Sequence, residues 1–237
     1  MIGKHLKRFP FDHIANFRDL GGYPIGNEGM SRYGVFFRST HLGLASNADL
    51  SKIKAMGIRT VIDLRCSDEI SLLPDACMND PEIHWANVSL MGDIPLDEID
   101  IVPNEKNTPS LVGMYKQILT LGADRLRELF MLLPEAVKNG AVLFHCAAGK
   151  DRTGITAMFL LSLCGVSRED IISDYEVSHT LMEAFSPEDI SGSNHSNMHD
   201  LLDFIAERHG SPRGYLMEIG VTESALETLK SSLYEPF

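Results

Sequence analysis

The sequence His145-Cys146-Ala147-Ala148-Gly149-Lys150-Asp151-Arg152-Thr153-Gly154 lies between two apolar runs. The run before it, Ala141 to Phe144, is short and rich in β-forming residues, and the run after it, Ile155 to Leu163, has the length of a buried helix. This order predicts a strand, a tight loop and a helix. Such a loop directs its backbone N–H groups at one point, and the helix N-terminus adds positive potential there. The ligand that suits this point is a tetrahedral oxyanion.

Cys146 stands at the mouth of the predicted anion site. Thiols at helix N-termini beside cations titrate at roughly 3.5–7.5, against about 8.5 for a free cysteine, so we expect an ionised, nucleophilic thiolate at neutral pH. Arg152 follows six positions later, and its planar fork can bind two phosphate oxygens at once. Gly149 and Gly154 allow a tight turn close to the ligand, and the Thr153 hydroxyl is placed to donate to the sulfur. These features favour phosphoryl-transfer chemistry over a buried core cysteine.

These residues resemble the signature loop of the cysteine-dependent protein tyrosine phosphatases, His-Cys-x-x-Gly-x-x-Arg-Thr-Gly. The longer form Gly-Lys-Asp-Arg-Thr-Gly is similar to the bacterial PtpB/LipA-like branch (tyrosine phosphatase family 3), for which dual-specificity and phosphoinositide activities are reported. Other segments that resemble this branch are Asn16 to Gly22, Phe37-Arg38-Ser39, Val61 to Arg65 with Glu69 after it, and, more weakly, Tyr215-Leu216 with Gly220-Val221. The resemblance extends from about residue 12 to the C-terminus.

The resemblance implies a protein tyrosine phosphatase that hydrolyses phosphotyrosine through a phosphocysteine intermediate and releases inorganic phosphate. The alternatives are a dual-specificity or phosphoinositide phosphatase, a sulfurtransferase or arsenate reductase, and a non-catalytic module that binds phospho groups. The last is disfavoured because Cys146 and Arg152 are both present. We expect neither a metal nor a cofactor, because Arg152, Lys150 and the loop amides supply the positive charge.

The leaving oxygen needs a proton, which a nearby carboxylic acid usually provides. In the branch that the chain resembles, the aspartate within the signature loop has this role, and Asp151 is its counterpart. Asp151 has an alternative role in orienting Arg152 or capping the helix. Asp63 is the competing acid, because it ends a predicted parallel strand, where ligand crevices form. Its alternative role is to pair with one of three arginines: Arg18, Arg38 or Arg65.

The remaining site predictions concern the loop and its support. We expect the phosphate to be bound by the loop residues Ala147, Ala148, Gly149, Lys150, Asp151 and Arg152. Lys150 adds a point charge at the rim of the loop, or is simply solvated. His145 is expected to hold the loop through hydrogen bonds, and Arg18, Asp19 and Arg38 to form a network behind it. Cys66 is either an inert small residue, which we favour, or a partner of Cys146 in a disulfide under oxidation.

The composition sets outer limits on function. The chain has 237 residues and a formal net charge of −12, which disfavours nucleic acid or an anionic membrane as a general partner. Its four cysteines fit no zinc pattern or disulfide framework. No apolar stretch resembles a secretion signal or approaches the ~20 residues of a membrane span. We therefore expect a cytoplasmic protein, with export without a signal left open.

The rest of the chain alternates between predicted helices and strands. The helices are expected at 47–56, 111–119, 124–137, 167–179, 198–208 and 222–233, and the strands at 58–64, 83–90 and 141–145. Asn47 and Ser167 are expected to cap their helices, and Pro134 to end its helix early. The pattern predicts an α/β sandwich, a mostly parallel central sheet flanked by helices. It predicts a single phosphatase domain over residues 1–237, with lid or insertion segments near 91–110 and 181–196.

Overall fold

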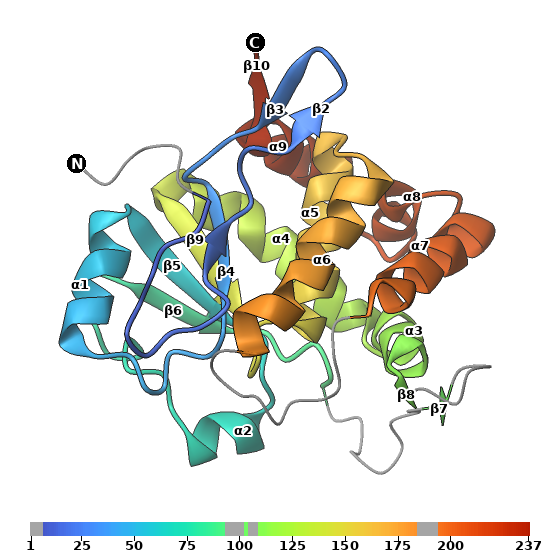
Figure 1. Cartoon of the computed structure of the whole chain (residues 1–237). Helices are drawn as coiled ribbons and strands as arrows, with labels where there is room; N and C mark the ends of the chain where they lie inside the picture. Colours follow the sequence, from blue (N-terminus) through green and yellow to red (C-terminus); the bar gives the residue numbers. More distant parts are fainter. Residues whose placement is uncertain (1–6, 93–101, 104–108, 184–193) are drawn as a thin grey trace.

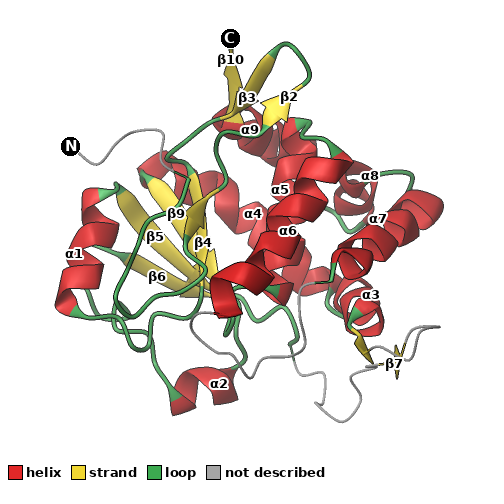
Figure 2. Ribbon diagram, in the orientation of Figure 1, coloured by secondary structure: helices red, strands yellow, loops and turns green. Residues whose placement is uncertain are grey.

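The centre of the molecule is a five-stranded sheet with the strand order β1-β4-β9-β5-β6 (Figure 1). The computed structural model describes residues 7–92, 102–103, 109–183 and 194–237. Four neighbouring strands run parallel, and β1 at one edge is antiparallel to β4. The predicted α/β class with a mostly parallel sheet flanked by helices is therefore confirmed (Figure 2).

Among the described residues, the first part of the chain contains mostly strands, the middle alternates between strands and helices, and the last part is mostly helical. The strands of the central sheet are β1 (Arg18–Asp19), β4 (Phe36–Ser39), β5 (Ile58–Asp63), β6 (His84–Asn87) and β9 (Ala141–His145). Two small antiparallel sheets consist of β2 (Pro24–Ile25), β3 (Gly29–Ser31) and β10 (Tyr234–Pro236), and of β7 (Val102–Pro103) and β8 (Pro109–Ser110). The helices are α1 (Asn47–Ala55), α2 (Ser67–Leu72), α3 (Val112–Thr120), α4 (Ala123–Ala136), α5 (Asp151–Cys164), α6 (Arg168–Glu183), α7 (His195–His209), α8 (Pro212–Glu218) and α9 (Glu223–Leu233).

The central sheet separates two apolar layers of unequal size. Successive strand residues point to opposite faces, so Val142 and Phe144 of β9 join the larger layer while Leu143 joins the smaller one. The smaller layer is covered by α1 together with the N-terminal segment, and the larger one by the remaining long helices (Figure 1). Both faces of the central strands are thus buried, which explains the continuous apolar run of β9.

Helix α5 is the core of the larger layer. Eleven of its fourteen residues are buried, which explains the uniformly apolar sequence from Ile155 onward. It packs against α6, α8 and α9, and the Phe159 ring stacks on Tyr215 with centroids 5.4 Å apart. Gly165, at φ 95°, ends the helix in the left-handed conformation that glycine adopts without strain. The helix that follows the signature loop is therefore packed on most of its surface.

Most predicted elements are confirmed, with differences at their ends. Ser46, rather than Asn47, caps α1: its hydroxyl accepts the Asp49 N–H at 3.1 Å while the Asp49 carboxylate accepts the Ser46 N–H at 3.0 Å. The prediction erred by one residue because this reciprocal pair satisfies two donors and Asn47 alone satisfies one. Ser167 caps α6 as predicted. Pro134 does not end α4, which continues to Ala136 and then into a 3₁₀ turn over Val137–Asn139.

Several elements were not predicted. Helix α2 has only six residues, and α8 has seven, starting from a Ser211 cap with a proline at its first position. Helix α6 extends to Glu183 and α7 begins at His195, so both enter the predicted 181–196 loop. Residues 184–193 of that segment, and residues 93–101 and 104–108 of the 91–110 segment, lie outside the described residues. Among the described residues, no helix is long and apolar enough to cross a membrane.

Replacing Phe159 by alanine tests the central role of α5. Phe159 is fully buried between Phe130 and Tyr215, so Phe159→Ala should lower the free energy of unfolding by about 3–5 kcal/mol. The matched control is Leu72→Ala, because Leu72 is 86% exposed, with an expected change within about 0.5 kcal/mol. Urea unfolding of both variants measures the difference, and equal stabilities would contradict the proposed packing.

Candidate active site

The signature loop lies where three parallel strands end. In β9, His145 is in register with Ser39 of β4 on one side and with Asp63 of β5 on the other. The carboxyl ends of parallel strands line the ligand crevice in open α/β sheets. The loop begins at Cys146, directly after β9, and α5 begins at Asp151, so the strand, loop and helix occur in the predicted order.

Cys146 is 2% exposed and free of any disulfide. Burial by itself raises the pKa of a thiol, but the Arg152 guanidinium and the Thr153 hydroxyl outweigh it, and the pKa of Cys146 lies below its ordinary value. The Thr153 hydroxyl is buried and meets no oxygen or nitrogen acceptor among the described residues, so the sulfur is its partner. The local field therefore favours a thiolate.

The carbonyl groups of the loop are held from outside. The Asn16 side-chain amide donates to the Ala148 and Gly149 oxygens at 3.1 and 2.9 Å, and Arg38 donates to the Gly149 oxygen at 2.8 Å. The His41 N–H donates to the Ala147 oxygen at 3.1 Å. The C=O and N–H of one peptide group point in opposite directions. A carbonyl that is bound on the outer side of the loop therefore leaves the N–H of the same peptide directed toward the inner side.

Three consecutive backbone N–H groups of the loop have no acceptor among the described residues. In the described parts of the chain, those of Ala147, Ala148 and Gly149 donate to no protein acceptor. Gly149 makes the tight curvature possible: its φ is +65°, and a Cβ at this position would lie 2.0 Å from the Ser39 carbonyl oxygen. Free N–H groups on an inward-curving backbone, at the N-terminus of α5, form an anion cup.

Arg152 is oriented by Glu69, whose role was not predicted. The Arg152 Nη1 and Nη2 atoms donate to the two Glu69 carboxylate oxygens at 2.5 and 2.7 Å. Burial raises the pKa of Glu69, but the arginine outweighs this and lowers it to about 2. Glu69 uses two of the five guanidinium N–H groups, so three remain for a phosphate. A carboxylate three residues into a short helix that follows Asp-Leu-Arg was the available sequence signal.

Asp151 is held by a hydroxyl from another helix. The Tyr115 hydroxyl of α3 donates to Asp151 Oδ1 at 2.5 Å, and the Lys150 ammonium lies 3.9 Å from Oδ2. The Asp151 side chain is 22% exposed, whereas Lys150 is 3% exposed. The alternative of a solvated Lys150 is therefore wrong, because its side chain is buried with the ammonium beside Asp151; its role as a point charge at the loop stays a prediction.

Asp63 lies beneath the loop rather than in the cup. It is fully buried and forms a bidentate pair with Arg65, with Nε–Oδ1 at 3.0 Å and Nη2–Oδ2 at 2.8 Å. Arg65 also donates to Asp75 at 3.0 Å, and the His145 Nε2 atom lies 2.9 Å from the second Asp75 oxygen. Burial by itself lowers the pKa of His145, but the Asp75 and Asp63 carboxylates outweigh this and raise it above its ordinary value. Two carboxylates thus face the Arg65 guanidinium and the His145 imidazole. His145 supports the loop through this group and through the Cys146 oxygen, 3.2 Å from its Nδ1.

Arg18 and Arg38 lie behind the loop and share one carboxylate, Asp174 of α6. Arg18 donates from Nε to Asp174 Oδ1 at 2.9 Å and Arg38 from Nη1 to Oδ2 at 2.5 Å, and all three side chains are buried. Burial by itself raises the pKa of Asp174, but the two arginines outweigh this and hold it well below its usual range. Asp174 was not predicted, although two arginines expected in one buried network imply a carboxylate partner.

Asp19 is not part of this network. Neighbouring strand residues point to opposite faces, so Asp19 turns away from Arg18 and accepts the N–H groups of Gly21 and Gly34 at 2.8 and 2.7 Å. Burial raises the pKa of Asp19 to about 6. Cys66 is half-buried and reduced, and its N–H donates to Glu69 at 2.9 Å. The favoured interpretation of Cys66 as an inert residue stays a prediction, as does the alternative of a disulfide with Cys146 under oxidation.

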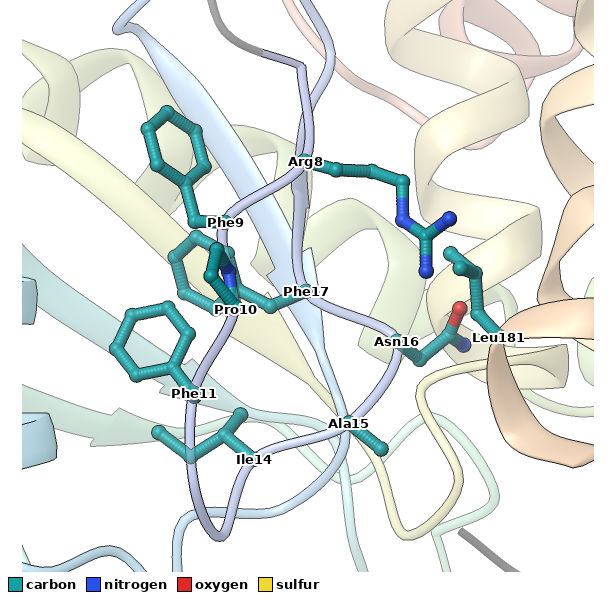
Figure 3. A pocket seen from close by; sticks show the side chains of 9 residues that line it. All are labelled: Arg8, Phe9, Pro10, Phe11, Ile14, Ala15, Asn16, Phe17 and Leu181. Atoms are coloured by element: carbon teal, nitrogen blue, oxygen red, sulfur yellow. The ribbon is translucent and has the colours of Figure 1, made fainter. Parts of the chain in front are cut away.

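A cavity of about 430 Å³ lies beside the loop (Figure 3). Figure 3 shows the Arg8, Asn16 and Leu181 side chains gathered on one side of it and Phe9 and Phe11 on the other. No residue of the signature loop lines it, so Asn16 forms the boundary between this cavity and the anion cup.

A family model described as tyrosine phosphatase family matches residues 9–235. The chain belongs to this tyrosine phosphatase family. A tyrosine-protein phosphatase of Nostoc commune is 31% identical over 84% of this chain and 74% of its own length. The triple specificity protein phosphatase PtpB of Mycobacterium tuberculosis is 24% identical over 92% of this chain and 96% of its own. A crystal structure of P. aeruginosa TpbA aligns at a TM-score of 0.43 and 15% identity, over 81% of this chain and 90% of that one.

The titration of Cys146 tests the electrostatics of the phosphatase loop. Thiolate absorbance measured against pH should show a step whose midpoint lies below about 8.5, the value for a free cysteine. Thr153→Val should move this midpoint to higher pH, because the thiolate loses a donor. Burial raises the pKa of Cys77 and Cys164 to about 12, so both absorb later.

Two controls identify the absorbing group in that titration. Cys146→Ser should abolish the early step, and Cys66→Ser should leave it in place. An early step that survives Cys146→Ser would contradict the assignment of the thiolate.

Replacing Gly149 by alanine tests the loop curvature. Alanine at positive φ costs about 1–2 kcal/mol, and here the added Cβ would also press on Ser39. Displacement of the loop should lower kcat/KM by about 10²-fold. The matched control is Gly26→Ala, because Gly26 also has positive φ (+54°) but meets nothing within 4 Å. It should lose stability without losing activity toward an aryl phosphate, and equal activities of the two variants would contradict the role of Gly149.

Proposed function

We propose that this phosphatase hydrolyses phosphotyrosine through a phosphocysteine intermediate. The observation that carries the proposal is the pairing of a low-pKa thiol with an anion cup: Cys146 adjoins backbone N–H groups that have no protein acceptor. Such a site binds a phosphoryl group and places a nucleophile beneath it.

In the first step, the Cys146 sulfur attacks phosphorus, and the bond between phosphorus and the phenolic oxygen breaks. Arg152 and the N–H groups of the loop bind the three equatorial oxygens, where the transition-state charge resides. The leaving oxygen takes a proton from a carboxylic acid and departs as tyrosine. The cysteine then carries the phosphoryl group.

In the second step, water attacks phosphorus, and the sulfur leaves as a thiolate. The same carboxylate that gave up its proton accepts one from the water, so inorganic phosphate is released and the site is restored. The Thr153 hydroxyl favours departure of the sulfur by donating to the developing thiolate.

We assign the acid role to Asp151 rather than Asp63. The Asp151 carboxyl is part of the loop and 22% exposed, so it can reach a bound ester. Asp63 is fully buried and binds Arg65 with both oxygens. Protonation of Asp63 would break this buried bidentate ion pair and leave Arg65 with Asp75 as its remaining carboxylate partner.

The substrate class follows from the family, and the names of the relatives support phosphotyrosine first. Dual-specificity or phosphoinositide hydrolysis is the second candidate, because a relative is named a triple specificity phosphatase. We also propose that the chain is a single phosphatase domain, which the match over residues 9–235 supports. A reducing compartment such as the cytoplasm fits the requirement for a free Cys146 thiolate.

Cys146→Ser tests the covalent mechanism. The variant should lose turnover of a phosphotyrosine peptide by at least about 10⁴-fold, because serine at this site is a far weaker nucleophile. It should still bind the peptide, because the loop amides and Arg152 remain. Calorimetry measures the binding, and acid quenching of the wild-type enzyme with ³²P-labelled peptide should trap a labelled protein.

A panel of substrates and a control variant complete this test. Phosphoserine peptide and a soluble phosphoinositide, assayed beside phosphotyrosine peptide, decide between the two candidates. Cys66→Ser should keep the label and the turnover. Full activity of Cys146→Ser, or a label on another residue, would overturn the mechanism.

A further inference from the structure

Asp151 is connected to a buried chain of hydroxyl groups outside the signature loop. Tyr115 of α3 donates to Asp151 Oδ1 at 2.5 Å, and its oxygen lies 2.6 Å from the Tyr175 hydroxyl of α6. Tyr175 interacts in turn with Asn197 of α7, whose oxygen accepts the Leu111 N–H at 3.3 Å. Helix α3 thus meets the consecutive helices α6 and α7, about 60 residues further along the chain, behind one carboxylate.

Tyr115 acts as a donor in this chain of contacts. It is fully buried, and burial together with the Asp151 charge raises the pKa of its hydroxyl well above the ordinary value. The hydroxyl therefore keeps its proton and presents it to Asp151. Burial also raises the pKa of Tyr175 well above its ordinary value, so the second hydroxyl stays neutral.

The bond from Tyr115 selects one oxygen of the carboxyl group. When Asp151 is protonated, the bond from Tyr115 favours the carbonyl form of Oδ1, because a carbonyl oxygen accepts more strongly than a carboxyl hydroxyl, so the acid proton favours Oδ2. The packing of Tyr115 and Tyr175, with ring centroids 6.3 Å apart, fixes the position of the donor. A partly exposed aspartate would otherwise sample several rotamers.

We propose that Tyr115 is a positioning residue for the leaving-group step, supported by Tyr175. It holds Asp151 with Oδ2 turned toward the ester, so that the proton passes from Oδ2 to the leaving oxygen. The carboxylate then formed keeps the hydrogen bond from Tyr115, and no proton moves along the tyrosines. This proposal rests on the proposed function, because it assigns Asp151 as the acid.

The test is a leaving-group series with Tyr115→Phe, in which kcat/KM is measured for two aryl phosphates. Phenyl phosphate needs protonation of a poor leaving group, whereas a fluorinated umbelliferyl phosphate does not. Tyr115→Phe should lower kcat/KM about tenfold for phenyl phosphate and less than twofold for the activated ester. Asp151→Asn should show a larger difference, within the 10²–10⁴-fold typical of general acids. Adding Tyr115→Phe to Asp151→Asn should produce no further difference between the esters.

Matched variants separate positioning from folding. Tyr215→Phe removes another buried hydroxyl, which donates to the Leu119 oxygen at 2.6 Å, and should leave the ratio between the two esters unchanged. Tyr175→Phe should change the ratio in the same direction as Tyr115→Phe, by a smaller factor, and serves if Tyr115→Phe does not fold.

The outcomes distinguish the two proposals. An equal loss on both esters, or no loss, would overturn the role of Tyr115 while leaving the phosphatase intact. A wild-type protein that hydrolyses neither ester would instead overturn the proposed function.

Discussion

The site depends on how the peptide groups of one loop are oriented. Asn16 and Arg38 bind the carbonyl oxygens on the outer side, and this leaves the N–H groups directed inward. A loop with its carbonyl groups inward would repel both a phosphate and a thiolate, so the same restraint serves the ligand and the nucleophile. The sequence of the loop supplies the glycine that permits this curvature, but the direction of the peptides is imposed by residues over a hundred positions away.

Holding the loop peptides in this orientation requires charged side chains in the interior of the protein. Each of these charges is neutralised by a partner close to it. Arg18 and Arg38 share Asp174, and Arg65 shares two carboxylates with His145. A buried charge without a partner is costly, so each of these side chains depends on the others. The two Asp174 carboxylate oxygens bind one arginine each, so this residue connects α6 to β1 and β4 and helps to position the loop. The net charge of −12 does not reveal these buried ion pairs, because it is a property of the whole chain.

The sequence predicted the parts of the site that are local. The strand, loop and helix around Cys146 could be inferred because apolar runs, glycines and an arginine at a set spacing follow one another in the chain. Asp174 and Tyr115 could not be assigned in this way, since each reaches the site by tertiary packing and neither has a distinctive neighbour sequence. Glu69 follows the Asp-Leu-Arg segment, but its pairing with Arg152 also arises from tertiary packing. The error over Asp19 has a similar origin: the strand it shares with Arg18 is only two residues long, too short to show alternation. Short elements such as α2 escaped prediction because six residues carry too little periodicity.

The shared carboxylate of Asp174 has a consequence for synthesis of the protein. A nascent chain that has reached Gly165 already contains the complete signature loop, but it lacks the helix that carries Asp174. Until that helix emerges from the ribosome and docks, Arg18 and Arg38 lack this carboxylate, and the Arg38 side chain that binds the Gly149 oxygen is not held in place. Catalytic competence therefore arises late, when segments about 150 residues apart have met, which is typical of slow-folding topologies with many non-local contacts.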